Sequence, residues 1–299
     1  MILGAHALEN CRKIARAKIN LALHITGQRD DGYHLLDSVV VFSTYGDEIT
    51  VSKREDGTAQ NASHHLTING PFGEGLEADH DNLVLKAARL MGDDVPPLNI
   101  VLEKNLPIAS GIGGGSADAA ATLLAIAELL DRPLPSSDDV LSLGADVPVC
   151  LHGCQHGTAI RMSGIGETLS ELQKTPALPI VLVNPNVGVS TPAIFKSLTS
   201  KNNPPLIQPN DTIDKAEPFT KWINDCSNDL QPPALIHCQQ VEECLNALST
   251  CNGTLTARMS GSGATCFGLF KNDEDAKSAA DTLQAEHPDW WVVATKLAG

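Results

Sequence analysis

Alternation of apolar and polar positions predicts β-strands along the first half of the chain. Residues 14–25 read IARAKINLALHI, and their second half alternates apolar with polar or small residues, as a half-buried strand does. Short apolar runs predict further strands at residues 39–42, 48–51, 66–68 and 98–102. The Gly-, Asp-, Asn- and His-rich residues 53–80 are expected to form loops around the strand at 66–68.

Helical patterns begin after this region. Asp81 or Asn82 is expected to cap a helix through Met91, and an Ala/Leu-rich helix is expected from Ser116 to about Leu130. Further helices are expected near residues 138–150, 217–226, 237–251 and 275–286, and further strands at 158–162, 180–183, 266–270 and 291–295. Four prolines within residues 200–218 predict a long loop there. Because strands and helices mix without strict β-α-β alternation, we expect an α+β fold in two domains, residues 1–158 and 159–299.

Composition narrows the class of protein. The 299 residues are 42% apolar and 19% charged, which is ordinary for a globular protein. A net charge of −15 repels polyanions, and 4% aromatic residues offer little for base stacking, so we expect no nucleic-acid binding. No run reaches 18 apolar residues and no signal-peptide pattern opens the chain, which predicts a cytoplasmic protein without a membrane role.

The eight cysteines form no C-x-x-C pair. Cys150 and Cys154, with His152 and His156 nearby, come closest to a metal-binding cluster, but their spacing matches no zinc motif. We therefore expect reduced thiols in or near a core and no protein-held metal site.

The strongest chemical signal is a glycine-rich segment directly before the Ala/Leu-rich helix. Residues 107–117 read PIASGIGGGSA, with no Asp or Glu from 105 through 117. Glycines let backbone N–H groups approach a ligand closely, and the helix behind them directs its positive end to the same place. The segment lacks the Gly-Lys-Ser/Thr of the P-loop and the third glycine of the dinucleotide fingerprint. A purely structural turn is the alternative to a phosphate-binding loop.

This segment resembles the signature of the kinases of galactose, homoserine, mevalonate and phosphomevalonate (the GHMP kinases), P-x-x-x-G-L-G-S/G-S-S/A. Other segments are similar to the 4-diphosphocytidyl-2-C-methyl-D-erythritol kinases within that superfamily, in order and spacing across nearly the whole chain. They are AKINL at 17–21, TGQRDDGYH at 26–34, LGADVP at 143–148, SNDL at 227–230 and MSGSGA at 259–264. Ile112 stands where Leu is commoner, and Ala117 removes a hydroxyl that Ser would offer.

The resemblance implies a two-domain fold, with a ribosomal-protein-S5-like N-terminal domain and a ferredoxin-like C-terminal domain. It also implies that ATP lies over the glycine-rich segment, with the acceptor substrate between the two halves of the chain. The implied ATP-binding residues are Pro107, Ile108, Ala109, Ser110, Gly111, Ile112, Gly113, Gly114, Gly115, Ser116 and Ala117. Mg²⁺ is expected with ATP, held mainly by phosphates and water rather than by the protein.

Lys18 and Asp146 are the two active-site residues that the resemblance implies. Asp146 would take the proton of the acceptor hydroxyl, while Lys18 would keep Asp146 ionised and offset charge on the phosphoryl group. The residues alone leave other roles open. Lys18 could extend its charge past a sheet edge to water, and Asp146 could cap a helix or belong to a turn.

Acceptor-binding residues are likewise implied by the resemblance. Tyr33 and Phe195 would stack on the two faces of cytosine, and His34 would bind the hydrogen-bonding edge of the ring. Asn20 would reach the same ligand as Lys18, and Thr191 completes the set. The alternatives are a hairpin turn at residues 31–34 and core packing for Phe195.

Two further segments carry weaker signals. Residues 260–263 are expected to close over the phosphates, or to form a plain turn. Asn228 and Asp229 are expected to cap a helix or to order that loop rather than to perform chemistry.

The expected function is ATP-dependent phosphorylation of the 2-hydroxyl of 4-diphosphocytidyl-2-C-methyl-D-erythritol, in non-mevalonate isoprenoid synthesis. A sibling kinase acting on homoserine or a mevalonate derivative is the first alternative. A non-catalytic nucleotide-binding sensor is the second. The expected partner is a small molecule, and the expected assembly is a monomer or weak homodimer.

Overall fold

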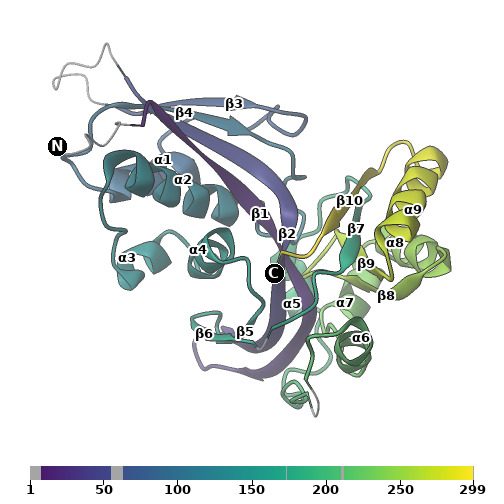
Figure 1. Cartoon of the computed structure of the whole chain (residues 1–299). Helices are drawn as coiled ribbons and strands as arrows, with labels where there is room; N and C mark the ends of the chain where they lie inside the picture. Colours follow the sequence, from purple (N-terminus) through teal and green to yellow (C-terminus); the bar gives the residue numbers. More distant parts are fainter. Residues whose placement is uncertain (1–7, 55–62, 173, 210–211, 299) are drawn as a thin grey trace. The chain divides into compact units, whose positions relative to one another are not determined.

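A computed structural model describes residues 8–54, 63–172, 174–209 and 212–298 in two compact units (Figure 1). Unit 1 holds the described residues up to Ala15 and those of Gly46–Leu106 and Gly114–Gln155. Unit 2 holds those of Arg16–Tyr45, Pro107–Gly113 and His156–Gly299. The predicted division into residues 1–158 and 159–299 stays a prediction. The chain passes between the two units several times, and one of these crossings lies within the glycine-rich segment, between Gly113 and Gly114.

Strands β1 (Asn10–Gln28) and β2 (His34–Lys53) pair with each other and contribute to both units. The sequence predicts a strand at 14–25 and two separate strands at 39–42 and 48–51. The first is longer than expected, and the second prediction is wrong because β2 continues through the polar residues 43–47. Two of these polar side chains, Ser43 and Asp47, are fully buried and hydrogen-bonded, so they do not end the strand.

Unit 1 packs helices on a small sheet. In it, β2 pairs antiparallel with β4 (Leu98–Glu103), which pairs parallel with β3 (His65–Asn69). Helix α1 (Leu83–Leu90) is capped as predicted by Asn82, whose side chain accepts from Val84 N, and it packs against α2 (Gly114–Leu130). Most residues of α2 are Ala, Leu or Ile, and its buried positions lie all round the helix, as expected for a central helix.

The helix predicted at residues 138–150 is two helices. Helix α3 (Ser137–Ser142) ends before Gly144, whose φ of 149° is open only to glycine, and α4 (Val147–Gln155) begins three residues later and packs on α2. The break therefore puts Asp146 directly before the first turn of α4.

Unit 2 contains a four-stranded antiparallel sheet in the order β10-β7-β9-β8. Its strands are β7 (Pro179–Asn184), β8 (Thr254–Met259), β9 (Cys266–Phe270) and β10 (Trp291–Lys296). Helices α8 (Gln239–Thr250) and α9 (Asp273–Glu286) lie on one face, and their buried residues share one core with β7 and β9 (Figure 1). This β-α-β-β-α-β order is the ferredoxin-like arrangement that we expected for the C-terminal half.

The remaining elements of unit 2 are short. Strand β5 (Ile160–Gly164) pairs antiparallel with β2 and with β6 (Thr168–Glu171), and the helices are α5 (Thr191–Lys196), α6 (Ala216–Asn224) and α7 (Gln231–His237). The sequence pattern missed β6, β8, α5 and α7, which are too short for a clear period. No helix or strand interrupts residues 197–209, in keeping with the predicted long loop.

The predicted state of the cysteines is confirmed, since all eight are free thiols and six of them are buried. No helix in the described parts of the chain has the length and apolar character needed to span a bilayer.

Candidate active site

The first part of the glycine-rich segment, Pro107–Gly113, is fixed within unit 2 by neutral hydrogen bonds. Buried Ser110 donates from Oγ to Pro107 O at 2.6 Å, and Ser110 O accepts from Thr265 N at 3.2 Å. Ile112 is fully buried, and its carbonyl accepts from Lys18 N at 2.9 Å. These bonds hold the loop to β1 on one side and to the turn before β9 on the other.

Gly111 sits against that turn so closely that no side chain fits. A Cβ at residue 111 would lie 2.6 Å from Gly263 O and 2.8 Å from Ser260 O, and the φ of Gly111 is 76°. Ser260 Oγ also donates to Gly111 O at 3.3 Å. The two glycine-rich segments named by the sequence therefore pack backbone to backbone, which only glycine permits.

Lys18 and Asn20 share one face of β1 beside this loop. Both side chains are buried, and Lys18 Nζ donates to Asn20 Oδ1 at 3.2 Å. Asn20 Nδ2 donates to Ser38 Oγ at 2.8 Å, and Ser38 Oγ donates to Ala22 O at 2.7 Å. The low exposure of Lys18, 5%, argues against the alternative in which its charge reaches water past a sheet edge.

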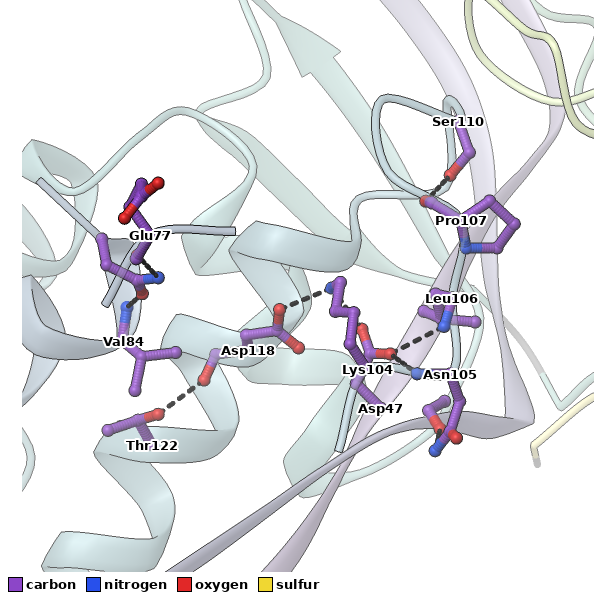
Figure 2. A network of polar contacts seen from close by, with 12 residues as sticks. Asp47, Glu77, Val84, Lys104, Asn105, Leu106, Pro107, Ser110, Asp118 and Thr122 are labelled. Carbon is purple, nitrogen blue, oxygen red and sulfur yellow. Dashed lines mark hydrogen bonds and ion pairs between the residues drawn. The ribbon is translucent and has the colours of Figure 1, made fainter. Parts of the chain in front are cut away.

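The second part of the segment begins α2 in unit 1 and rests on a buried ion cluster (Figure 2). Lys104 Nζ lies 2.5 Å from Asp47 Oδ2 and 2.6 Å from Asp118 Oδ2, and all three side chains are buried. Asp47 Oδ1 also accepts from the backbone N–H groups of Asn105 and Leu106, at 2.6 and 2.8 Å. We call Lys104, Asp47 and Asp118 the ion triad.

The ion triad has one cation for two carboxylates, and this imbalance shifts its pKa values. Burial, together with the charge of Asp47, raises the pKa of Asp118 to about 8 despite the opposing attraction of Lys104. Burial disfavours the charged form of Lys104, but the two carboxylates outweigh it and raise the pKa of the ammonium group. Asp118 Oδ1 is buried with no hydrogen-bond partner among the described residues. The raised pKa favours the protonated form of the Asp118 carboxyl near neutral pH.

The ion triad also limits the space under the glycine-rich segment. A Cβ at Gly114 would lie 3.1 Å from Lys104 Nζ, so any other residue would make the buried ammonium group shift by a few tenths of an ångström. Positive φ values occur instead at Gly111 and Gly113. The start of α2 combines this close approach with free N–H donors and the positive end of a 17-residue helix, which suits an anion such as phosphate.

Asp146 lies in unit 1 at the turn before α4. It is half-buried, and its carbonyl accepts from Cys150 N at 3.0 Å, as the residue before the first turn of a helix does. The backbone of Asp146 thus has the position that the alternative of a helix cap or turn predicts. The role of its carboxylate in the reaction stays a prediction.

The residues expected to bind the acceptor lie in unit 2. His34 and Phe195 are half-buried and their ring centroids are 4.9 Å apart, whereas Tyr33 is 63% exposed. Burial and then the charge of Lys201 lower the pKa of His34, so the ring is neutral near pH 7. His34 Nε2 is buried without a hydrogen-bond partner in the described residues.

Thr191 is exposed at the start of α5, and its hydroxyl lies 2.7 Å from that of Ser262. Ser262 belongs to the turn that holds Gly111. The structure therefore connects a residue expected to bind the acceptor with the turn that supports the glycine-rich segment.

The ion triad and Ser38 were missed by the sequence analysis. One signal for the triad was available, since Asp118 is the lone charge in the first ten residues of an Ala/Leu-rich helix that follows a segment without carboxylates. Asp47 gave no such signal, because a polar residue after Tyr45-Gly46 is typical of a turn.

Comparisons with known proteins agree with this geometry. The sequence matches two family models, "GHMP kinases N terminal domain" over residues 82–164 and "GHMP kinases C terminal" over residues 215–289. Together they cover more than half of the chain. The first contains the glycine-rich segment and Asp146, and the second contains the turn at 260–263.

Several relatives match nearly the whole chain. A 4-diphosphocytidyl-2-C-methyl-D-erythritol kinase of Cereibacter sphaeroides is 50% identical over 286 residues, which are 95% of this chain and 98% of the relative. The protein of that name from Ruegeria pomeroyi is 52% identical over 279 residues, 93% of this chain and 95% of the relative.

Solved structures lead to the same fold. A crystal structure of 4-(cytidine 5'-diphospho)-2C-methyl-D-erythritol kinase has a TM-score of 0.77 at 29% identity, covering 96% of this chain and 99% of its own. A homoserine kinase of Cytophaga hutchinsonii has a TM-score of 0.66 at 16% identity, covering 100% and 98%, and shows the fold alone. The predicted two-domain α+β fold is confirmed, and the chain belongs to the GHMP kinases and, within them, to the family of 4-diphosphocytidyl-2-C-methyl-D-erythritol kinases.

Proposed function

We propose that this kinase transfers the γ-phosphoryl group of ATP to the 2-hydroxyl of 4-diphosphocytidyl-2-C-methyl-D-erythritol. The observation that carries the proposal is about 50% identity, over nearly the full length of both chains, to relatives that bear this name. The sibling-kinase alternative is not favoured, because the homoserine kinase shares only 16% identity with the chain. The sensor alternative is not favoured either, since both Lys18 and Asp146 are present.

The phosphates of ATP are assigned to the segment Pro107–Ala117. Support comes from the close backbone packing at Gly111, the space restriction at Gly114 and the free N–H donors at the start of α2. These groups bind a polyanion through backbone donors, without a lysine in the segment. Mg²⁺ would neutralise phosphate charge, and it is assigned to the phosphates and water because the segment offers no carboxylate.

Asp146 is proposed as the general base and Lys18 as the cation that offsets charge on the transferring group. Asp146 is half-buried directly before the start of α4, where its backbone is held while its carboxylate can meet a hydroxyl. Lys18 is held rigid by burial and by Asn20. Because phosphoryl transfer has a loose transition state, such positioned charges supply most of the protein's contribution.

The cytosine ring of the acceptor is assigned to Tyr33, His34 and Phe195. The exposed ring of Tyr33 and the half-buried ring of Phe195 both suit stacking. A neutral His34 offers one donor and one acceptor, which can distinguish cytosine from uracil at the ring edge. Asn20 and Thr191 are assigned to the remainder of the acceptor.

The test is an ADP-release assay with an acceptor panel of 4-diphosphocytidyl-2-C-methyl-D-erythritol, its uridine analogue, homoserine and mevalonate. We expect turnover with the cytidine acceptor and at least tenfold less with the others. Turnover with homoserine or mevalonate alone would select the sibling-kinase alternative. ATP binding without turnover on any acceptor would select the sensor.

The same assay tests the catalytic assignments. Asp146→Asn keeps the shape and removes the base, so kcat should fall about 100-fold or more while the unfolding temperature stays unchanged. A variant whose kcat lies within about threefold of the wild-type value would remove Asp146 from the mechanism.

Tyr33→Ala should raise KM for the cytidine acceptor and leave KM for ATP nearly unchanged, because one stacking face is lost.

The small-molecule acceptor is the partner that this function requires. A monomer or weak homodimer, and a cytoplasmic location, stay predictions. Sedimentation velocity over a range of concentrations tests the first of them.

A further inference from the structure

Asn228 lies in unit 2 between β1 and the turn that supports the glycine-rich segment. Its backbone forms a bridge with Leu23 of β1, where Ser227 O accepts from Leu23 N at 2.9 Å and Asp229 N donates to Leu23 O at 2.8 Å. The side chain is only 4% exposed. The backbone of Asn228 is therefore fixed to the same strand that carries Lys18 and Asn20.

Both N–H donors of the Asn228 side-chain amide form hydrogen bonds. Asn228 Nδ2 donates to Met259 O at 2.8 Å and to Gly261 O at 2.9 Å, while Oδ1 accepts from Leu230 N at 3.0 Å. A primary amide has two N–H donors, and here both meet carbonyls of the same turn. The amide thus bridges the two ends of residues 259–261.

The turn held by Asn228 also holds the glycine-rich segment. Ser260 Oγ accepts from Asn20 N at 3.1 Å and donates to Gly111 O, and Thr265 N donates to Ser110 O. Gly261 is so close that a Cβ on it would lie 2.9 Å from Gly111 O. A shift of this turn by a few tenths of an ångström would therefore move Gly111.

We propose that Asn228 is a positioning residue for ATP, which acts by clamping the turn at 259–261 against the glycine-rich segment. It touches neither ATP nor acceptor and transfers no proton. The proposal rests on the proposed function only in taking Pro107–Gly113 to be part of the ATP site.

The sharpest variant is Asn228→Asp, which keeps the shape but replaces both donors with an acceptor facing two carbonyl oxygens. The turn should then shift, and the dissociation constant for ATP, measured by calorimetry without any acceptor, should rise about tenfold or more. The kcat of this variant should change less than its KM for ATP. Asn228→Leu, which removes the donors without adding charge, should raise the same dissociation constant by a smaller factor.

A pH series separates clamping from general damage. Burial beside two carbonyls favours the protonated form of the introduced carboxyl, and this form regains one donor. The ratio of ATP dissociation constants, Asn228→Asp over wild type, should therefore fall as pH decreases from 8 to 6. Asn228→Leu has no titrating group at this position, so its ratio should stay constant over the same range.

Two control variants isolate the effect. Asn186→Asp makes the same chemical change at an exposed position of unit 2, where Nδ2 donates to Asp289 O, and it should leave ATP binding unchanged. Leu283→Ala lowers stability from the buried face of α9, and it should lower the unfolding temperature without a selective change in ATP affinity.

A coupling experiment keeps the proposal falsifiable if Asn228→Asp folds poorly. Ser260→Ala acts on the same path, so its effect and that of Asn228→Leu on ATP affinity should be smaller together than the sum of the single effects. Unchanged ATP affinity in both Asn228 variants, or fully additive effects with Ser260→Ala, would overturn the proposal. Because wild-type ATP binding is measured without acceptor, a failure of the proposed acceptor assignment is seen separately, as absent turnover with intact ATP binding.

Discussion

The two parts of the glycine-rich segment are held in place by different kinds of contact. In unit 2, Gly111 and Ser110 are fixed by neutral hydrogen bonds and by backbone packing against the turn to which the amide of Asn228 binds. In unit 1, the start of α2 rests on Lys104 and its two buried carboxylates. Adjacent residues of one loop therefore depend on hydrogen-bond geometry on one side and on buried charge on the other.

This difference indicates how each part responds to change. A neutral network depends on distance and direction, and it is nearly insensitive to pH and salt. A buried ion cluster costs desolvation and is stable only while its charges are matched. Mutations in unit 2 should therefore act through shape, and those in unit 1 through charge.

The largest expected effect comes from removing the cation of the ion triad. Lys104→Met leaves Asp47 and Asp118 buried beside each other without a counter-charge, which should lower the free energy of unfolding by about 3–5 kcal/mol. Urea unfolding at pH 7 measures it. Lys277→Met, at an exposed ion pair with Asp281, is the matched control and should cost less than about 1 kcal/mol. Similar losses in the two variants would contradict a role for buried charge.

The next effect tests shape in unit 2. Gly111→Ala puts a Cβ within 2.6 Å of Gly263 O at a positive φ, and it should lower the free energy of unfolding by about 1–3 kcal/mol. The matched control is Gly115→Ala at the start of α2. There the nearest atom to a new Cβ is Leu83 Cδ1 at 3.6 Å, so alanine should be tolerated or slightly stabilising. Thermal unfolding measures the stability of both variants. Equal losses of stability would mean that the tight packing at Gly111 does not cause the loss in Gly111→Ala.

The smallest effect is the change in stability for each pH unit, which the titration of Asp118 in unit 1 should cause. Because the pKa of Asp118 is raised to about 8, the folded protein binds a proton here that the unfolded chain releases above about pH 4. This contribution to stability is complete below the unfolded pKa and is lost as pH rises towards 8. The loss is at most about 1.4 kcal/mol for each pH unit.

Asp118→Asn removes this titration while keeping the shape. Its stability relative to the wild type should therefore rise between pH 5 and pH 8, as followed by urea unfolding across that range. Ser260→Ala, in the neutral network of unit 2, should differ from the wild type by an amount that does not change with pH. A constant difference for Asp118→Asn would show that Asp118 is already ionised at pH 5.

Much of the candidate site was predictable because its signals are local in sequence. Four glycines in five positions before an Ala/Leu-rich helix indicate a phosphate loop from neighbouring residues alone. Motifs around Lys18, Asp146 and Ser260 are short runs of neighbouring residues, and they are enough to identify the family. The expectation that Asn228 orders the turn at 260–263 is confirmed, since both of its Nδ2 donors bind that turn. Its other reading, as a helix cap, is wrong, because the cap residue of α7 is Leu230 and no side chain caps this helix.

The sequence by itself determined most strands and helices, the glycine-rich loop before α2 and the membership of the kinase family, since each depends on periodicity or on short motifs. Only the tertiary structure decided that β2 is one strand and that Asp47 and Asp118 share Lys104. Lys104 is 57 residues from the first and 14 from the second. No local pattern reports such a pairing, because a charged side chain looks the same in sequence whether it faces water or a buried partner. Burial and pairing arise only when distant segments meet, and they decide which charges are held inside.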